Sequence, residues 1–195
     1  MLSLEESLKI LKKTNALIEG HFILSSGLHS SKYVQCAKLM SIPNEAVKIC
    51  QSLAEKIKKE FTHFNIILSP AMGGIIVGYE LGKLLDKKTI FSERVDGEFK
   101  LRRGFKIEKG NKVLIVEDVI TTGKSSLECV KLIKKAKASL VGFAAIIDRS
   151  SKKSLRIKTK IISHLKIDVP TYKKNEVPKN LNLIPITKPG SRFIK

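Results

Sequence analysis

Residues on which several classes of protein depend are scarce in this sequence. The chain has no tryptophan, 6% aromatic residues and only six arginines. Proteins that read nucleic-acid bases favour arginine and stacked aromatic side chains, so we expect no nucleic-acid partner. The three cysteines, Cys36, Cys50 and Cys129, are odd in number and widely spaced. That spacing fits neither a disulfide framework nor a zinc site, and a reducing cytoplasm is the simplest location.

Long apolar runs and acidic residues are also scarce. No run approaches the roughly 20 apolar residues that span a membrane, and the acidic, helix-like first residues are unlike a signal peptide, so we expect no membrane partner. The 37 Lys and Arg residues outnumber the 18 Asp and Glu residues, which gives a formal net charge of +19. Most of this charge is lysine spread along the chain. We interpret it mainly as a solvated surface, although a basic chain also suits an anionic substrate.

The apolar pattern predicts an α/β fold. With 195 residues, 43% of them hydrophobic, the chain is long enough for one domain with its own core. Helices are expected over four ranges: 3–18, 43–60, 75–85 and 124–137. Short apolar strands are expected over four others: 65–69, 88–92, 113–117 and 140–148. This alternation predicts a parallel sheet flanked by helices, and the Gly- and Ser-rich residues 20–35 predict a loop or short hairpin.

Ligands of such sheets bind at the carboxyl ends of the strands. Four loops lie there: 69–74, 92–104, 117–125 and 148–151. The third is the most informative, because an apolar strand leads into Glu117 and Asp118 and then into Thr121-Thr122-Gly123-Lys124-Ser125 at the start of a helix. Backbone N–H groups at a helix start and nearby hydroxyls stabilise a phosphate. The carboxylates would accept hydrogen bonds from sugar hydroxyls or lie near a bound Mg²⁺.

Two other interpretations apply to this segment. A helix capped after a strand, with solvated acids beside it, would share the Thr-Thr-Gly turn but not the whole pattern. Gly123-Lys124-Ser125 also matches the end of a nucleoside-triphosphate P-loop, but that motif needs a glycine where Asp118 stands. We therefore interpret the segment as a sugar-phosphate site.

Each remaining loop has a structural and a functional interpretation. Gly73 and Gly74 suit either a tight turn or a loop that presents N–H groups to a pyrophosphate. Residues 93–105 suit either a solvated hairpin or a basic lid over the reacting anion. Arg149 suits either a surface ion pair or a bidentate contact with a carboxylate. His21 and His29 suit either ligands or bases or packing within a loop, of which we favour packing, and we interpret His63 and His164 as structural.

The segment 113–126 resembles the signature of type I phosphoribosyltransferases, which bind 5-phosphoribosyl 1-pyrophosphate. The resemblance implies that Glu117 and Asp118 hold the ribose hydroxyls while residues 121–125 surround the 5-phosphate. Lys124 is a departure, since a second glycine is usual there. The donor-binding residues implied in this way are Arg94, Glu117, Asp118, Val119, Ile120, Thr121, Thr122, Gly123, Lys124 and Ser125.

Further stretches resemble one branch of that family, the orotate phosphoribosyltransferases. They are residues 20–33, the ERVDGEFKLRRGF segment at 93–105, and the C-terminal segments 169–172 and 188–192. Three departures are visible. Ser25 and Gly73 stand where a lysine occurs in relatives, and residues 93–105 contain no histidine.

The resemblance implies the architecture as well. Residues 1–195 would form a single domain of the type I phosphoribosyltransferase fold. Residues 1–40 and the C-terminal segment would form a small hood subdomain over the base pocket. A cytoplasmic homodimer is implied, in which the lid at 93–105 reaches the partner's site.

The resemblance also implies the reaction. The phosphoribosyl group would pass to orotate, giving orotidine 5'-monophosphate and pyrophosphate in pyrimidine biosynthesis. Thr121 and Arg149 would bind orotate, and Asp118, Lys100 and Arg103 would be catalytic, with Mg²⁺ carried by the substrate rather than by protein side chains. A purine-base phosphoribosyltransferase is the alternative, against which residues 20–33 argue. A nucleic-acid-binding regulator on the same fold is a third, which the scattered lysines disfavour.

Overall fold

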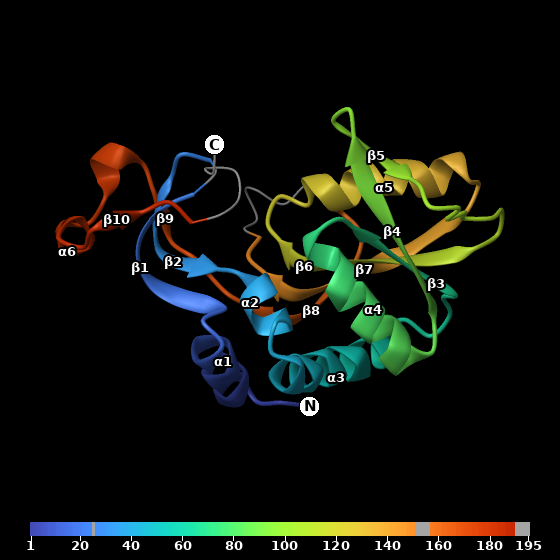
Figure 1. Cartoon of the computed structure of the whole chain (residues 1–195), viewed down its shortest axis with the longest axis horizontal. Helices are drawn as coiled ribbons and strands as arrows, with labels where there is room; N and C mark the ends of the chain where they lie inside the picture. Colours follow the sequence, from blue (N-terminus) through green and yellow to red (C-terminus); the bar gives the residue numbers. More distant parts are fainter. Residues whose placement is uncertain (25, 151–156, 190–195) are drawn as a thin grey trace.

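The computed structural model describes residues 1–24, 26–150 and 157–189. Figure 1 shows a six-stranded sheet with helices at one end of the molecule and a smaller four-stranded sheet at the other. The helices are α1 Leu4–Lys13, α2 Cys36–Met40, α3 Pro43–Glu60, α4 Gly73–Leu85, α5 Lys124–Lys135, the 3-10 turn η1 Lys174–Glu176 and α6 Lys179–Asn182. The strands are β1 Leu17–Ile23, β2 His29–Val34, β3 Ile66–Pro70, β4 Lys88–Val95, β5 Glu98–Leu101, β6 Lys112–Ile120, β7 Ser139–Asp148, β8 Ile161–Lys166, β9 Thr171–Tyr172 and β10 Ile186–Thr187.

The large sheet has the order β5-β4-β3-β6-β7-β8, and all its pairings are parallel except that of the edge strand β5 with β4. Side chains alternate between its two faces. Val113 and Ile115 of β6 pack with α5, whereas Leu114 and Val116 join the cluster formed with α3 and α4. The predicted fold class, a parallel sheet flanked by helices, is confirmed. In the described part of the chain, no helix is long and apolar enough to cross a membrane.

The small sheet has the order β10-β1-β2-β9, so it joins the two ends of the sequence. It shares a core with the large sheet, because Leu17 and Val34 belong to the same buried cluster as α3 and α4. The Ser7 hydroxyl of α1 also lies 2.8 Å from His164 Nε2 of β8, and both residues are buried. His164 therefore has the structural role predicted for it. The C-terminal segment 188–192 is described only as far as residue 189, and residue 25 and residue 151 lie outside the described ranges.

Among the predicted element boundaries, two call for comment. The helix predicted over 3–18 begins with the expected capping box of Ser3 and Glu6 but ends at Lys13. Asn15 then takes a left-handed φ of 54°, which reverses the chain so that Ile18 belongs to β1 instead. The strand predicted to end at Glu117 continues to Ile120.

The segment interpreted either as a solvated hairpin or as a basic lid has regular structure. Residues 93–105 include the end of β4 and the whole of β5, which pair as an antiparallel hairpin. Asp96 and Gly97 both have positive φ at its turn, as a two-residue hairpin turn of type I′ requires. The solvated hairpin, one of the two interpretations of this segment, therefore describes its shape.

Candidate active site

Consecutive acidic residues near the end of β6 point to opposite faces of the large sheet. Glu117 continues the face of Val113 and Ile115 toward α5, and Asp118 continues the face of Leu114 and Val116 toward α4. The alternation of a β-strand requires this. The two carboxylates therefore have different neighbours, although only one peptide bond separates the residues.

Glu117 is enclosed against the first turn of α5. Its side chain is buried, and Glu117 Oε1 accepts a hydrogen bond from the Ser126 hydroxyl at 2.9 Å. Burial raises the pKa of the Glu117 carboxyl to about 8, an effect that the Ser126 hydrogen bond opposes and the nearby Asp118 charge reinforces. No cation among the described residues offsets the burial, so a ligand that brings hydrogen-bond donors or positive charge would favour the ionised form.

Asp118 is enclosed against the loop that starts α4. A Cβ atom at Gly73 would lie 2.5 Å from Asp118 Oδ2, so the carboxylate can occupy this position only because residue 73 has no side chain. Burial also raises the pKa of Asp118, while hydrogen bonds from the backbone of Val119 and of Asp118 itself lower it. The structure thus gives a reason for the absence of a lysine at position 73, since Asp118 takes the space that the Cβ of a lysine would need.

The turn between β6 and α5 has the geometry of an anion cradle. Gly123 is the N-cap of α5 with a left-handed φ of 72°, and a Cβ there would lie 2.5 Å from Ile157 Cδ1. Glycine is therefore required both for conformation and for space. Thr121 and Thr122 are exposed before it, and α5 begins at Lys124. The first N–H groups of a helix have no intrahelical partner, so they can donate to a phosphate.

Val119 and Ile120 were predicted as part of this loop, but they are the last two residues of β6. Ile120 is buried in the cluster with α5, and its carbonyl accepts a hydrogen bond from the Arg149 N–H at 2.8 Å. The side chain of Ile120 is therefore unavailable to a ligand. The loop itself starts at Thr121 and continues through Ser125, which is half-buried in the first helical turn.

Arg149 follows β7, the neighbour of β6 in the sheet. It is half-buried, and its Nε is enclosed without a hydrogen-bond partner among the described residues. Burial lowers the pKa of the guanidinium, which Tyr33 and Cys36 counteract. A half-buried cation without a carboxylate partner among the described residues favours binding of an anionic ligand.

The small sheet reaches Arg149 through Tyr33 on β2. Burial raises the pKa of the Tyr33 hydroxyl, while the charge of Arg149 lowers it and the charge of Asp118 raises it. The next element of the chain contributes Cys36, whose sulfur lies 3.7 Å from the Asp118 carbonyl oxygen. Tyr33 and Cys36 were not among the predicted site residues, because only the folding of β2 over the strand ends brings them near Asp118 and Arg149.

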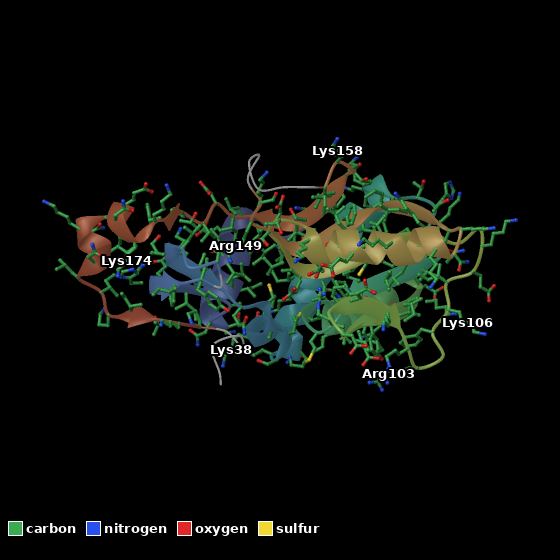
Figure 2. All side chains as sticks on the ribbon, turned by 90° about the horizontal axis from the view of Figure 1, so that it is seen from above. Lys38, Arg103, Lys106, Arg149, Lys158 and Lys174 are labelled. Carbon is green, nitrogen blue, oxygen red and sulfur yellow. The ribbon has the colours of Figure 1, made fainter. Side chains whose placement is uncertain are left out.

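The basic residues of the hairpin are not gathered around the two carboxylates. Arg103 donates two hydrogen bonds to Glu93, at 3.0 Å from Nε and 2.9 Å from Nη2. Lys100 lies 3.5 Å from Asp96, and Arg94 lies 2.8 Å from Glu128 of α5. Figure 2 shows Arg103 at the outer edge of the molecule, well separated from Arg149. Within one chain, the predicted site residues thus form two groups: the strand-end group of residues 117–125 with Arg149, and the hairpin group.

Two grooves of the described surface lie outside the strand-end group. One of about 420 Å³ lies beneath α5 and includes Leu127, Val130 and Phe143. Another of about 340 Å³ lies in the small sheet, beside Tyr172 and Leu181. Neither includes a carboxylate of β6 or Arg149. The burial of Glu117 and the enclosed Nε of Arg149 therefore identify the site better than these grooves do.

Comparison with known proteins agrees with this geometry. The phosphoribosyl transferase domain model matches residues 40–178. The chain is 47% identical over 191 residues to an orotate phosphoribosyltransferase of Caldicellulosiruptor saccharolyticus, with 98% of each chain covered. It is 45% identical over 189 residues to that of Erythrobacter litoralis, with 96% and 97% covered. The crystal structure of orotate phosphoribosyltransferase from Aeropyrum pernix is similar in fold, with a TM-score of 0.71, 23% identity, and 82% of this chain and 92% of that chain covered. The chain therefore belongs to the orotate phosphoribosyltransferases, within the phosphoribosyl transferase domain family.

Proposed function

We propose that this chain transfers the phosphoribosyl group of 5-phosphoribosyl 1-pyrophosphate to orotate, giving orotidine 5'-monophosphate and pyrophosphate in pyrimidine biosynthesis. The observation that carries the proposal is that the β6 carboxylates, which burial makes harder to ionise, lie near the half-buried guanidinium of Arg149, whose Nε has no hydrogen-bond partner among the described residues. The carboxylates suit sugar hydroxyls, and the guanidinium suits the carboxylate of orotate. The close relatives that bear the name of this activity support it.

The reaction requires no protein nucleophile. Orotate N1 forms a bond with the anomeric carbon of the ribose while the bond from that carbon to the pyrophosphate oxygen breaks, and the N1 proton ends on the departing pyrophosphate. The protein contributes by holding both substrates in line and by stabilising the charge that develops. We infer where each part of the substrates lies from the residues that would bind it.

Each group of the site has a separate task in this proposal. Glu117 and Asp118 accept hydrogen bonds from the ribose hydroxyls, and residues 121–125 donate N–H and O–H groups to the 5-phosphate. Thr121 and Arg149 bind the orotate carboxylate. Gly73 and the start of α4 lie directly against Asp118, so their N–H groups are available for the pyrophosphate.

Mg²⁺ fits this site only as a partner shared with the substrate. The enclosed carboxylates of Glu117 and Asp118 favour a nearby cation, but the described residues contain no cluster of three or more metal-ligating side chains. Pyrophosphate and ribose oxygens would supply the remaining ligands, in keeping with the preference of Mg²⁺ for phosphate oxygens. When bound, the ion would neutralise charge on the departing pyrophosphate.

The proposed assembly is a homodimer in which the hairpin of one chain serves the site of the other. Two observations support it. The hairpin cations lie away from the strand-end group of their own chain. In addition, the large exposed apolar residues Met72, Ile76 and Tyr79 recur along one side of α4, next to the loop that contacts Asp118. On a surface dominated by lysine, such a stripe is where two copies of a +19 chain could meet with least repulsion.

The small sheet would act as a hood over the base in this assembly, as the approach of Tyr33 to Arg149 suggests. The cytoplasm is the proposed location. The three cysteines are buried free thiols, which suits a reducing compartment.

A spectrophotometric assay of orotate loss, with 5-phosphoribosyl 1-pyrophosphate and Mg²⁺, tests the proposed reaction. We expect turnover with orotate and little or none with adenine, hypoxanthine or uracil. Preference for a purine base would reassign the acceptor. Steeply salt-dependent binding of RNA or DNA without turnover of any base would replace the enzyme with a nucleic-acid binder.

A further inference from the structure

The hairpin is fastened to the phosphate-binding helix by two neighbouring contacts. Ser92 and Arg94 lie on the face of β4 that turns toward α5, two residues apart as the strand period requires. Ser92 Oγ lies 3.3 Å from Cys129 Sγ, and both residues are fully enclosed. Two residues further along β4, Arg94 Nη2 lies 2.8 Å from Glu128 Oε2. The contacts therefore pair consecutive residues of α5 with alternate residues of β4.

The guanidinium of Arg94 is held in place on the hairpin itself. Its Nη1 donates to the Gly97 carbonyl at the turn. Its Cζ lies 4.2 Å from the centroid of the Phe99 ring on β5, within the range of a cation–π contact. The cation that faces Glu128 is thus fixed by three partners. Glu128 in turn has only 20% of its side chain exposed, so the ion pair is partly shielded from solvent and from salt.

Glu128 lies one helical turn after Lys124, the first residue of α5. The first turn is tied to β6 through Ser126 and Glu117, while Glu128 and Cys129 tie the next turn to β4. The direction of the N–H groups in the phosphate cradle depends on both attachments, because a helix moves as a rigid rod over two turns. An unpaired carboxylate at position 128 would also repel a phosphate bound one turn away, and Arg94 neutralises it.

We propose that Glu128 is a positioning residue for the donor substrate, and that Arg94 acts through Glu128 rather than as a ligand of 5-phosphoribosyl 1-pyrophosphate. The proposal rests on the proposed function for the identity of the donor. It assigns to the hairpin a role in its own chain, distinct from any contact it makes with a partner. Removing either member of the pair loosens α5 and weakens donor binding without disturbing the orotate site around Arg149.

The test compares Glu128→Gln, Arg94→Ala and the double variant by calorimetric binding of 5-phosphoribosyl 1-pyrophosphate and by steady-state kinetics. We expect each single variant to weaken donor binding about tenfold, with kcat and the KM for orotate changed less than about twofold. The double variant should be no worse than either single one, since both remove the same contact. Arg94→Lys keeps the charge but loses the planar contacts, so its donor binding should lie between that of the wild type and that of Arg94→Ala.

Glu98→Gln is the matched control. It makes the same chemical change as Glu128→Gln on the hairpin that carries Arg94, at an exposed residue with no ion pair among the described residues, and should leave donor binding unchanged. Melting temperatures of all variants show whether the fold survives.

Normal or tighter donor binding by Glu128→Gln, together with weak binding by Arg94→Ala, would make Arg94 a direct ligand and overturn the proposal. Additive effects in the double variant, or equal losses in kcat and in orotate binding, would also overturn it. Calorimetry needs no acceptor base. A wild-type chain that binds the donor but does not convert orotate would therefore refute the proposed function while leaving this inference testable.

Discussion

The hydroxyl of Ser126 donates a hydrogen bond across 2.9 Å to Oε1 of Glu117. This contact joins the first turn of α5 to the end of β6, so the groups proposed to bind phosphate and ribose form one rigid unit. It also holds a carboxylate in an enclosed position where ionisation is unfavourable. Because ionising the Glu117 carboxyl destabilises the free protein, the free energy of unfolding should depend on pH.

Replacing Glu117 by Gln should stabilise the free protein increasingly as the pH rises. Burial raises the pKa of Glu117 from its ordinary value of 4.5 to about 8. Below both values the carboxyl is protonated in the folded and unfolded states alike. Between them, only the unfolded chain releases the proton, so the wild type loses stability as the pH rises toward 8. With about 1.4 kcal/mol for each pKa unit, the loss amounts to a few kcal/mol.

Urea unfolding of both proteins at pH 5 and pH 8, without ligand, measures this difference. The stability of Glu117→Gln relative to the wild type should be greater at pH 8 than at pH 5. A difference that stays constant across this range would show that Glu117 is already ionised in the free protein. The variant should at the same time lose turnover, because it lacks the ribose-binding carboxylate.

Asp118→Asn should lose most of its turnover while the fold survives. Asn is close in shape to Asp and leaves the contact with Gly73 intact, but it lacks the negative charge and one acceptor oxygen. We expect a loss of about a hundredfold or more in kcat/KM, as for other groups that act on the reacting centre. Asp86→Asn, at the exposed left-handed C-cap of α4, is the matched control and should stay active. Unchanged activity of Asp118→Asn would exclude the ribose-binding role.

Arg149→Ala should weaken the binding of orotate far more than that of the donor. Losing a charge-assisted contact with the orotate carboxylate should cost roughly 1.5–3 kcal/mol, or about 10- to 150-fold in affinity. Separate titrations with the two substrates measure the two effects. Lys166→Ala is the control, since Lys166 is an exposed cation beside the same strand end, 3.9 Å from Asp148. Equal weakening of both substrates would move Arg149 out of the base pocket.

The sequence predicts the centre of the fold well because its signals there are local. The helix at 43–60 coincides with α3, and the buried strands of β3, β6 and β7 lie where apolar runs occur. The acids at 117 and 118 and the glycine at 123 could be assigned to one site because strand ends and helix starts have fixed geometry. Those assignments depend on neighbours within a few residues in the chain.

The parts that the sequence could not predict depend on distant pairings. β9 and β10 are two residues long, and they exist only because they add to β2 and β1 across more than 140 positions of sequence. Tyr33 approaches Arg149 for the same reason. The pairing of Arg94 with Glu128 was also invisible, because it requires the hairpin to lie along α5. A pattern of charges cannot tell whether an arginine faces a substrate or a neighbouring carboxylate.

Mixed dimers test whether the hairpin serves a partner's site. The motivating observation is that Lys100 and Arg103 lie on the hairpin, outside the strand-end group of their own chain. One variant carries Lys100→Ala with Arg103→Ala, and the other carries Asp118→Asn. Each homodimer should be nearly inactive. In a hybrid, one of the two sites combines an intact hairpin with an intact strand end. Random mixing makes about half of the dimers hybrid, so about a quarter of wild-type activity should return.

Independent proof of subunit exchange, for example by energy transfer between labelled chains, is the required control. Exchange without recovery would mean that the hairpin serves its own chain or takes no part in the reaction. A chain that is monomeric at the assay concentration, yet active, would exclude the proposed dimer altogether.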